Sequence, residues 1–285
     1  MIDRRGDSGF SKAGQDEWEA AMDYGYQLLR HVVQQVFGNL GQAARLTGLL
    51  TVLPYLFGIF VIGSLVGWDF LTHDPTASYD AQRMDEIGRR FLEIGPSLLV
   101  LMPLIVLVAV ICYAWAAIGW HRYVLLEEYG AGLLPTWNWD LVKGYLWAVI
   151  RIFLIALLTG FALGFAIGVA AVAVQSPAFF FFLGVGYAIA LTWVITRVGL
   201  ILPSAALGQP MRIGESWTLT EPVSGAILLP IIVIPIVFLL LNGLLQIVPV
   251  VGLLLSFVLG WLQVLVNLAL MTTLYGNLVE GRALN

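Results

Sequence analysis

Six long apolar stretches dominate the sequence and most strongly limit the folds open to it. A helix needs about 20 consecutive, mainly apolar residues to cross the hydrocarbon of a bilayer. Backbone polar groups at that depth must bond within their own segment, which a helix achieves. The sequence therefore predicts an all-α polytopic membrane protein with six transmembrane helices. The predicted spans are residues 46–68, 97–120, 145–174, 179–202, 226–248 and 251–274.

The composition excludes two large classes of protein. Of 285 residues, 60% are hydrophobic and 11% are charged, and the mean hydropathy is +0.90. A soluble domain is about half apolar and about a quarter charged, and a fold of this size cannot hide so much apolar surface from water. A soluble globular enzyme is therefore excluded. The net charge of −4 likewise excludes a strongly basic nucleic-acid binder, so we expect no nucleic acid among the partners.

The region before the first span is polar, so we expect no cleavable signal peptide. Residues 1–15, rich in glycine, serine and charge, are predicted to be a disordered tail. Residues 16–45 are predicted to form a cytoplasmic amphipathic helix, because apolar side chains from Trp18 to Leu40 recur at helical spacing. This helix is too polar to span, so its expected place is along the membrane surface or against a partner.

The rest of the chain forms a membrane domain over residues 46–280, followed by a short tail at 281–285. Its first outer loop is predicted to hold a short amphipathic helix that begins at Ser78 and is stopped by Gly95-Pro96. Eleven lysines and arginines fall on the side of the N-terminus and three, in the outer loop, on the other. The positive-inside rule therefore places both termini in the cytoplasm.

Two arginines lie inside the predicted spans. Arg151 and Arg197 both come about 7–9 Å below the cytoplasmic boundary, at about 1.5 Å per residue. Together with His121 and Arg122 at the inner end of span two, they could bind an anionic lipid or substrate headgroup. The alternative is that both arginines snorkel and only set the topology. No span contains an acidic residue, which argues against a proton-coupled transporter.

Polar amides and small residues mark the remaining spans. Asn242 and Gln246 lie four residues apart on span five, and so do Gln263 and Asn267 on span six. They could line a polar path, although hydrogen bonding between helices is the favoured interpretation. Span three carries Gly160, Gly164 and Gly168, a spacing that forms a groove for close helix packing.

The sequence offers no recognisable catalytic or metal centre. There are three histidines and one cysteine, Cys112, and no metal-ligand cluster is visible among them. Hydrolase, nucleotide-binding and zinc-protease motifs are absent from the sequence, as are paired aspartates or a Ser/His pair inside a span. We therefore expect no enzyme activity, no cofactor and no metal.

The cytoplasmic ends of the even-numbered spans carry a family resemblance. The segments are 120–127 (WHRYVLLE), 202–208 (LPSAALG) with 215–220 (ESWTLT), and 275–281 (YGNLVEG). They resemble a loose set of six-span bacterial inner-membrane proteins, itself similar to the membrane domain attached to some glycerophosphodiester phosphodiesterases. The resemblance implies a bacterial inner membrane and phospholipid chemistry nearby. It adds no reaction, because the phosphodiesterase barrel has no counterpart here.

These observations lead to one functional hypothesis and two rivals. The hypothesis is a non-enzymatic scaffold, assembly or lipid-organising component, in contact with the phospholipid bilayer, an anionic lipid or a membrane-protein partner. The first rival is a transporter or channel for a small or amphipathic solute, with a path past the four amides. The second rival is an intramembrane enzyme acting on lipid.

Overall fold

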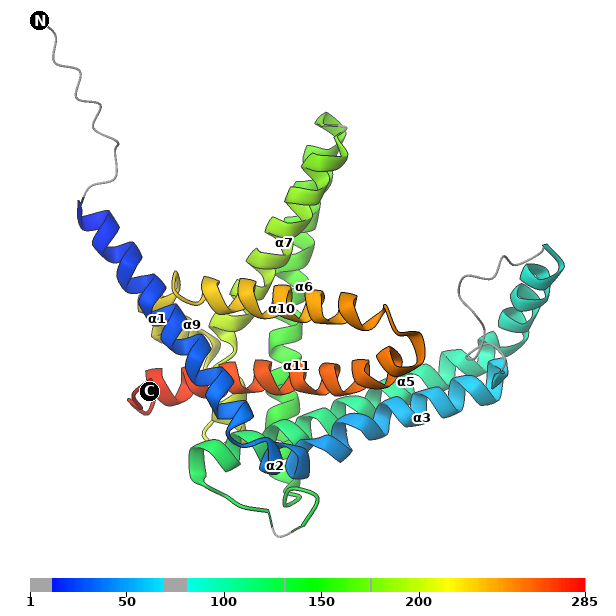
Figure 1. Ribbon diagram of the computed structural model, residues 1–285, viewed down its shortest axis with the longest axis horizontal. Helices are drawn as coiled ribbons and strands as arrows, with labels where there is room; N and C mark the ends of the chain where they lie inside the picture. Colours follow the sequence, from blue (N-terminus) through cyan, green and yellow to red (C-terminus); the bar gives the residue numbers. More distant parts are fainter. Residues whose placement is uncertain (1–11, 69–80, 131, 175, 285) are drawn as a thin grey trace, which may run out of the picture. The chain divides into compact units, whose positions relative to one another are not determined.

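A computed structural model describes residues 12–68, 81–130, 132–174 and 176–284 (Figure 1). Regular structure in this part of the chain is entirely helical, and it contains no strand. Six of its helices are long and apolar enough to cross a membrane. The predicted all-α fold with six spans is therefore confirmed. The tail predicted at 1–15 lies mostly outside the described residues, as do positions 69–80 of the first outer loop.

The span boundaries differ from the predicted ones by a few residues, mostly because helices continue beyond the apolar stretches. The observed spans are Leu40–Leu65, Leu92–Leu126, Trp139–Ala170, Pro177–Ala206, Leu228–Leu245 and Leu255–Leu278.

The chain divides into two compact units. One consists of residues Leu40–Leu146, and the other combines the residues up to Asn39 with those from Trp147 onward.

The Leu40–Leu146 unit is built on a pair of packed helices. The short α2 (Leu40–Ala43) and the π-helical turn η1 (Ala44–Gly48) lead into α3 (Leu49–Val66), which packs along α5 (Ala81–Leu126) (Figure 1). The centre of their contact is small and apolar, formed by Leu50, Cys112 and Ala116. Small side chains at such a contact let two helix backbones approach closely.

α5 corrects the predicted outer-loop helix. The expected break at Gly95-Pro96 is absent, because α5 runs without interruption from Ala81 through Pro96 and Pro103 to Leu126. The amphipathic segment is thus the first part of α5, continuous with span two, rather than a separate helix. Proline removes one backbone donor, but membrane helices tolerate it because neighbouring groups and local adjustment satisfy the freed carbonyl.

The second unit contains the other hairpins. The unit boundary falls inside α6 (Trp139–Ala173), which is followed by α7 (Pro177–Val198). A short connection then holds α8 (Ile201–Ala206), α9 (Ile213–Leu219) and the 3₁₀ turn η2 (Glu221–Val223). The last pair of spans is α10 (Leu228–Leu245) and α11 (Pro249–Leu278), and the turn between them ends at Pro249 as the sequence indicates.

The N-terminal helix α1 (Lys12–Phe37) packs on α10 and α11 of the same unit. It begins four residues before the predicted start, and a separate helix follows from Leu40. Leu28, Val32 and Val36 are fully buried along one face of α1. The Tyr24 hydroxyl donates a hydrogen bond of 2.6 Å to Asn277 Oδ1, near the end of α11. Figure 1 shows α1 crossing the beginning of α10 and the end of α11.

Candidate functional site

Arg197 lies at the end of α7, where it organises the connection that follows. The residue is 5% exposed. Its Nη2 donates a 2.7 Å hydrogen bond to the carbonyl oxygen of Trp217, and its Nε donates one of 3.2 Å to Thr220 Oγ1. The backbone carbonyl of Arg197 accepts a 2.7 Å hydrogen bond from the Ser216 hydroxyl. Both ends of this residue therefore fasten α9 to the last turn of α7.

Two indole rings enclose the Arg197 guanidinium group. Its carbon lies 3.7 Å from the ring centroid of Trp217 and 5.0 Å from that of Trp193. The two rings meet edge to face at 5.7 Å, and Trp193 Nε1 donates to the carbonyl of Ser224 at 2.8 Å. A guanidinium group over an aromatic face is stabilised by about 0.5–2 kcal/mol. Among the residues that the structure describes, the buried Arg197 cation is held by these rings, a carbonyl and a hydroxyl, and by no carboxylate within hydrogen-bond distance.

Arg151, on α6, reaches the same connection at a different point. Its Nη1 lies 3.4 Å from the carbonyl oxygen of Met211, which precedes α9. The Met211 backbone N–H in turn donates to Ser204 Oγ of α8 at 3.2 Å. Arg151 is half-buried, and its Nε is inaccessible to water and has no hydrogen-bond partner among the described residues. Arg151 thus keeps donor capacity that Arg197 has used.

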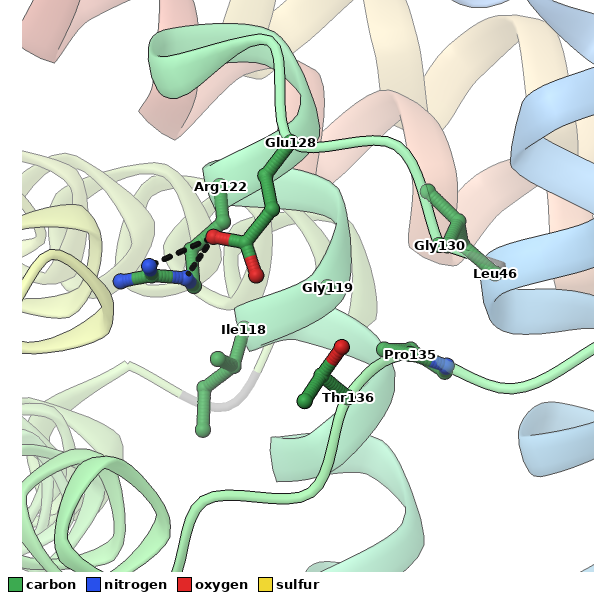
Figure 2. A pocket seen from close by; sticks show the side chains of 8 residues that line it. All are labelled: Leu46, Ile118, Gly119, Arg122, Glu128, Gly130, Pro135 and Thr136. Carbon is green, nitrogen blue, oxygen red and sulfur yellow. Dashed lines mark hydrogen bonds and ion pairs between the residues drawn. The ribbon is translucent and has the colours of Figure 1, made fainter. Parts of the chain in front are cut away.

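His121 and Arg122 belong to the Leu40–Leu146 unit and have different surroundings. The His121 side chain is fully buried, with its ring centroid 6.0 Å from that of Tyr145. Arg122 forms an ion pair with Glu128, in which Nε and a carboxylate oxygen are 2.6 Å apart (Figure 2). Of these two residues, the histidine is enclosed by protein and the arginine already has an acidic partner.

The acidic partner of Arg122 could not be predicted from helical spacing. In a continuing helix no acid lies three or four residues after Arg122, and Glu127 is five residues on. In the structure α5 ends at Leu126, and Glu127 takes a left-handed conformation with φ of 54°. This conformation is typical of a residue that closes a helix. It turns the chain so that Glu128, not Glu127, meets Arg122.

A small hollow lies beside this ion pair. Figure 2 shows Arg122 and Glu128 on one side of it and Gly119, Pro135 and Thr136 on another. A Cβ atom at Gly119 would come within 2.7 Å of Pro135 Cβ and closer still to Cγ. Trp115 Nε1 donates to the Pro135 carbonyl at 3.1 Å. Glycine at position 119 thus allows the loop after α5 to pack directly on that helix.

The four amides do not meet as two facing pairs. Asn242 Nδ2 donates to the carbonyl of Phe238 at 2.9 Å, and Asn267 Nδ2 donates to that of Gln263 at 2.8 Å. Each of these bonds stays within one helix, between residues four apart. Asn267 and Gln246 are exposed, whereas Asn242 and Gln263 are half-buried.

The glycine groove of α6 is only partly occupied. A Cβ atom at Gly160 would lie 2.8 Å from the Tyr187 hydroxyl of α7, which places that side chain against the helix. Nothing lies within 4 Å of the corresponding positions at Gly164 and Gly168.

The aromatic enclosure of Arg197 also escaped the sequence analysis. Trp193 and Arg197 are four residues apart and so share one helix face, a signal that could have paired them. Trp217 comes 20 residues later, and no local pattern indicates that the chain turns back there. Among the described residues, no group of three or more His, Cys, Asp or Glu side chains could hold a metal ion.

The chain matches no protein-family model, no curated protein and no solved structure. The resemblance at the ends of the even-numbered spans therefore stays a prediction. What the fold establishes is an integral multi-pass membrane protein whose helices contact a lipid bilayer.

Proposed function

We propose that this protein is a non-enzymatic assembly component of its membrane, a scaffold that associates with other membrane helices. The observation that carries the proposal is the position of Asn267. It lies close to the middle of the Leu255–Leu278 span, and it is exposed. Its amide nitrogen bonds to the carbonyl of Gln263 in the same helix, which leaves the side-chain oxygen available as an acceptor.

An exposed amide at this depth favours helix association. Hydrocarbon offers no hydrogen-bond partner to a polar group. A second helix that supplies a donor gains about 0.6–2 kcal/mol for the bond. Partly open small-residue positions at Gly164 and Gly168 on α6 add a second place for close helix approach. Both features suit a protein that assembles with partners.

Native mass spectrometry of the protein, released gently from its own membrane, tests this proposal. We expect the wild type to carry a second polypeptide, either another copy or a different chain, and Asn267→Leu to lose it. Asn242→Leu is the matched control, because that amide is half-buried and bonds to Phe238. A wild-type protein that appears only as a single chain would overturn the proposal. So would an Asn267→Leu variant that is less stable but keeps its partner.

The alternative transporter or channel function finds less support. It requires a polar path past the four amides of α10 and α11. Asn242 and Asn267 instead bond to carbonyls of their own helices, and Arg151 and Arg197 bond to the connection between α8 and η2. This use of the polar groups favours a structural role for them over the lining of a route. Solute flux into vesicles that is lost on Asn267→Leu would favour the transporter.

A lipid-organising contribution is proposed for Arg151. Its single long hydrogen bond to Met211 leaves terminal N–H groups of the guanidinium able to bind a phosphate oxygen. Copurified anionic lipid should fall in Arg151→Gln and persist in Arg122→Gln, because Arg122 is paired with Glu128. Unchanged lipid in Arg151→Gln would contradict this contribution.

We further propose a bacterial inner membrane and cytoplasmic termini. The bias of lysine and arginine supports the orientation. The bond between Tyr24 and Asn277 agrees with it, because it joins the N-terminal helix to the end of the last span. Alkaline phosphatase fused after Asn285 should be inactive, since that enzyme needs the oxidising periplasm, and the same enzyme inserted near residue 75 should be active. The reverse pattern would overturn the orientation.

A further inference from the structure

The N-terminal helix α1 carries a second apolar face that no described residue of its unit covers. Its buried face holds Leu28, Val32 and Val36. Beside it runs an exposed apolar stripe, which we define as Trp18, Met22, Tyr26, Val33 and Phe37, with exposed fractions of 60%, 45%, 61%, 41% and 53%.

From Trp18 to Phe37 most residues of α1 fall into three sectors around its axis, and the exposed Glu19, at the same angle as Phe37, interrupts the apolar one. At about 100° per residue, the exposed apolar stripe lies directly next to the buried face. Asp23, Gln27, Arg30 and Gln34 follow on the far side of the stripe, and all four are exposed. The order around the helix is therefore protein-facing, apolar and polar. A helix that contacts protein, lipid and water needs one sector for each of these environments, in this order. A helix on the surface of a soluble protein needs only a protein-facing sector and a water-facing sector.

The contacts of α1 place it at the end of the spans. Gly25 packs against the carbonyl of Ala226 and the side chain of Leu229, where α10 begins. Tyr24 bonds to Asn277, one residue before α11 ends. The spanning segments are Leu228–Leu245 and Leu255–Leu278, so both contacts fall at the level of the bilayer surface. The helix that carries the stripe therefore lies at the level where these two spans leave the hydrocarbon.

We infer that the stripe of α1 inserts into the headgroup layer of the phospholipid bilayer, as a monotopic helix attached to the membrane domain. Trp, Tyr and Phe are the side chains suited to that depth. The insertion is apolar rather than electrostatic: between residues 12 and 37 the helix carries Lys12 and Arg30 against Asp16, Glu17, Glu19 and Asp23. A zwitterionic surface therefore suffices, and no basic patch is needed.

Spin-label accessibility in the full-length protein tests the inference. In a Cys112→Ala background, single cysteines replace Met22 or Val33 on the stripe, and Gln27 or Gln34 on the polar sector as matched controls. Each protein is labelled and placed in phosphatidylcholine vesicles. Collision rates are measured with oxygen, which concentrates in lipid, and with a water-soluble nickel chelate. We expect the oxygen-to-nickel ratio at 22 and 33 to exceed that at 27 and 34 several-fold.

Two results would overturn the inference. Equal ratios at all four positions would mean that the stripe faces water. Strongly immobilised labels at 22 and 33 that exclude both reagents would mean that protein covers it, either a second copy or another chain. The pairs 22/27 and 33/34 are independent, so one variant that fails to fold leaves the test intact. Failure of this inference leaves the assembly proposal standing, because that proposal depends on Asn267 in α11.

Discussion

Replacing Arg197 by methionine should destabilise the protein by about 2–3 kcal/mol. Two hydrogen bonds from a charged donor contribute about 2 kcal/mol or more, and stacking on Trp217 at 3.7 Å contributes up to about 2 kcal/mol. Methionine fills a similar volume. Because it is neutral, its burial carries no cost of removing a charge from water, and this offsets part of the lost stabilisation. The balance remains unfavourable because both hydrogen bonds from the Arg197 side chain to α9 and its end are lost, and only the bonds to the Arg197 backbone carbonyl remain.

The assay is the free energy of unfolding in mixed detergent micelles, obtained from a denaturant titration. Arg212→Met is the matched control, since Arg212 is exposed and precedes α9 directly; we expect a change within about 0.5 kcal/mol. Arg197→Lys should recover less than half of the loss, because an ammonium group cannot form the same fork or stack as a plane. An Arg197→Met protein as stable as the control would refute the reasoning.

Three further predictions concern other contacts. Gly119→Ala should destabilise the protein by about 1–3 kcal/mol, because the new Cβ atom would collide with Pro135. Gly144→Ala is the control and should not destabilise it, because nothing lies within 4 Å of a Cβ atom there. Equal melting temperatures of the two variants would contradict this prediction. Glu128→Gln should cost less than about 1 kcal/mol, because its side chain is 39% exposed in the pair with Arg122, and a larger loss on thermal unfolding would show a buried role. Burial raises the pKa of the Tyr24 phenol above its ordinary value of 10.0. The neutral phenol therefore stabilises the fold below pH 10, and this contribution disappears as the pH rises through the folded-state pKa. Tyr24→Phe should lose less stability than the wild type between pH 9 and 11, and parallel pH profiles would refute the assignment.

The spans were predictable from the sequence because the requirement behind them is local. A stretch such as 226–248 contains its own apolar side chains and satisfies its own backbone bonds, so its helix could be identified without knowledge of its neighbours. The same reasoning failed at Pro96. Proline is read as a stop because it removes one backbone hydrogen bond, but the apolar segment after it favours continuing the helix through α5.

The candidate site was less predictable, because its partners are distant in sequence or depend on a turn. The sequence marked Arg151 and Arg197 either as a headgroup site or as snorkelling residues, but nothing near them indicates Met211 or Trp217 as acceptors. The partner of Arg122 depends on the conformation of one residue, Glu127. Hydrophobic periodicity describes a helix and its faces, and it does not describe where a connection folds back.

Several polar side chains within the spans follow one physical rule, and it bears on function. Thr47, Thr51, Thr196 and Asn242 each donate to a carbonyl four residues earlier in the same span. Arg197 instead donates to groups outside its helix, on the connection at α9. A polar group inside hydrocarbon must find a partner, and these take the nearest protein oxygen. Asn267 differs from these residues in its position. Its Nδ2 also donates to a carbonyl four residues earlier, but the side chain is exposed near the middle of the span. Its remaining acceptor needs a donor, and within a bilayer another helix can supply one. This is the reason to search for function at the outer surface of α11 rather than along a path between the spans.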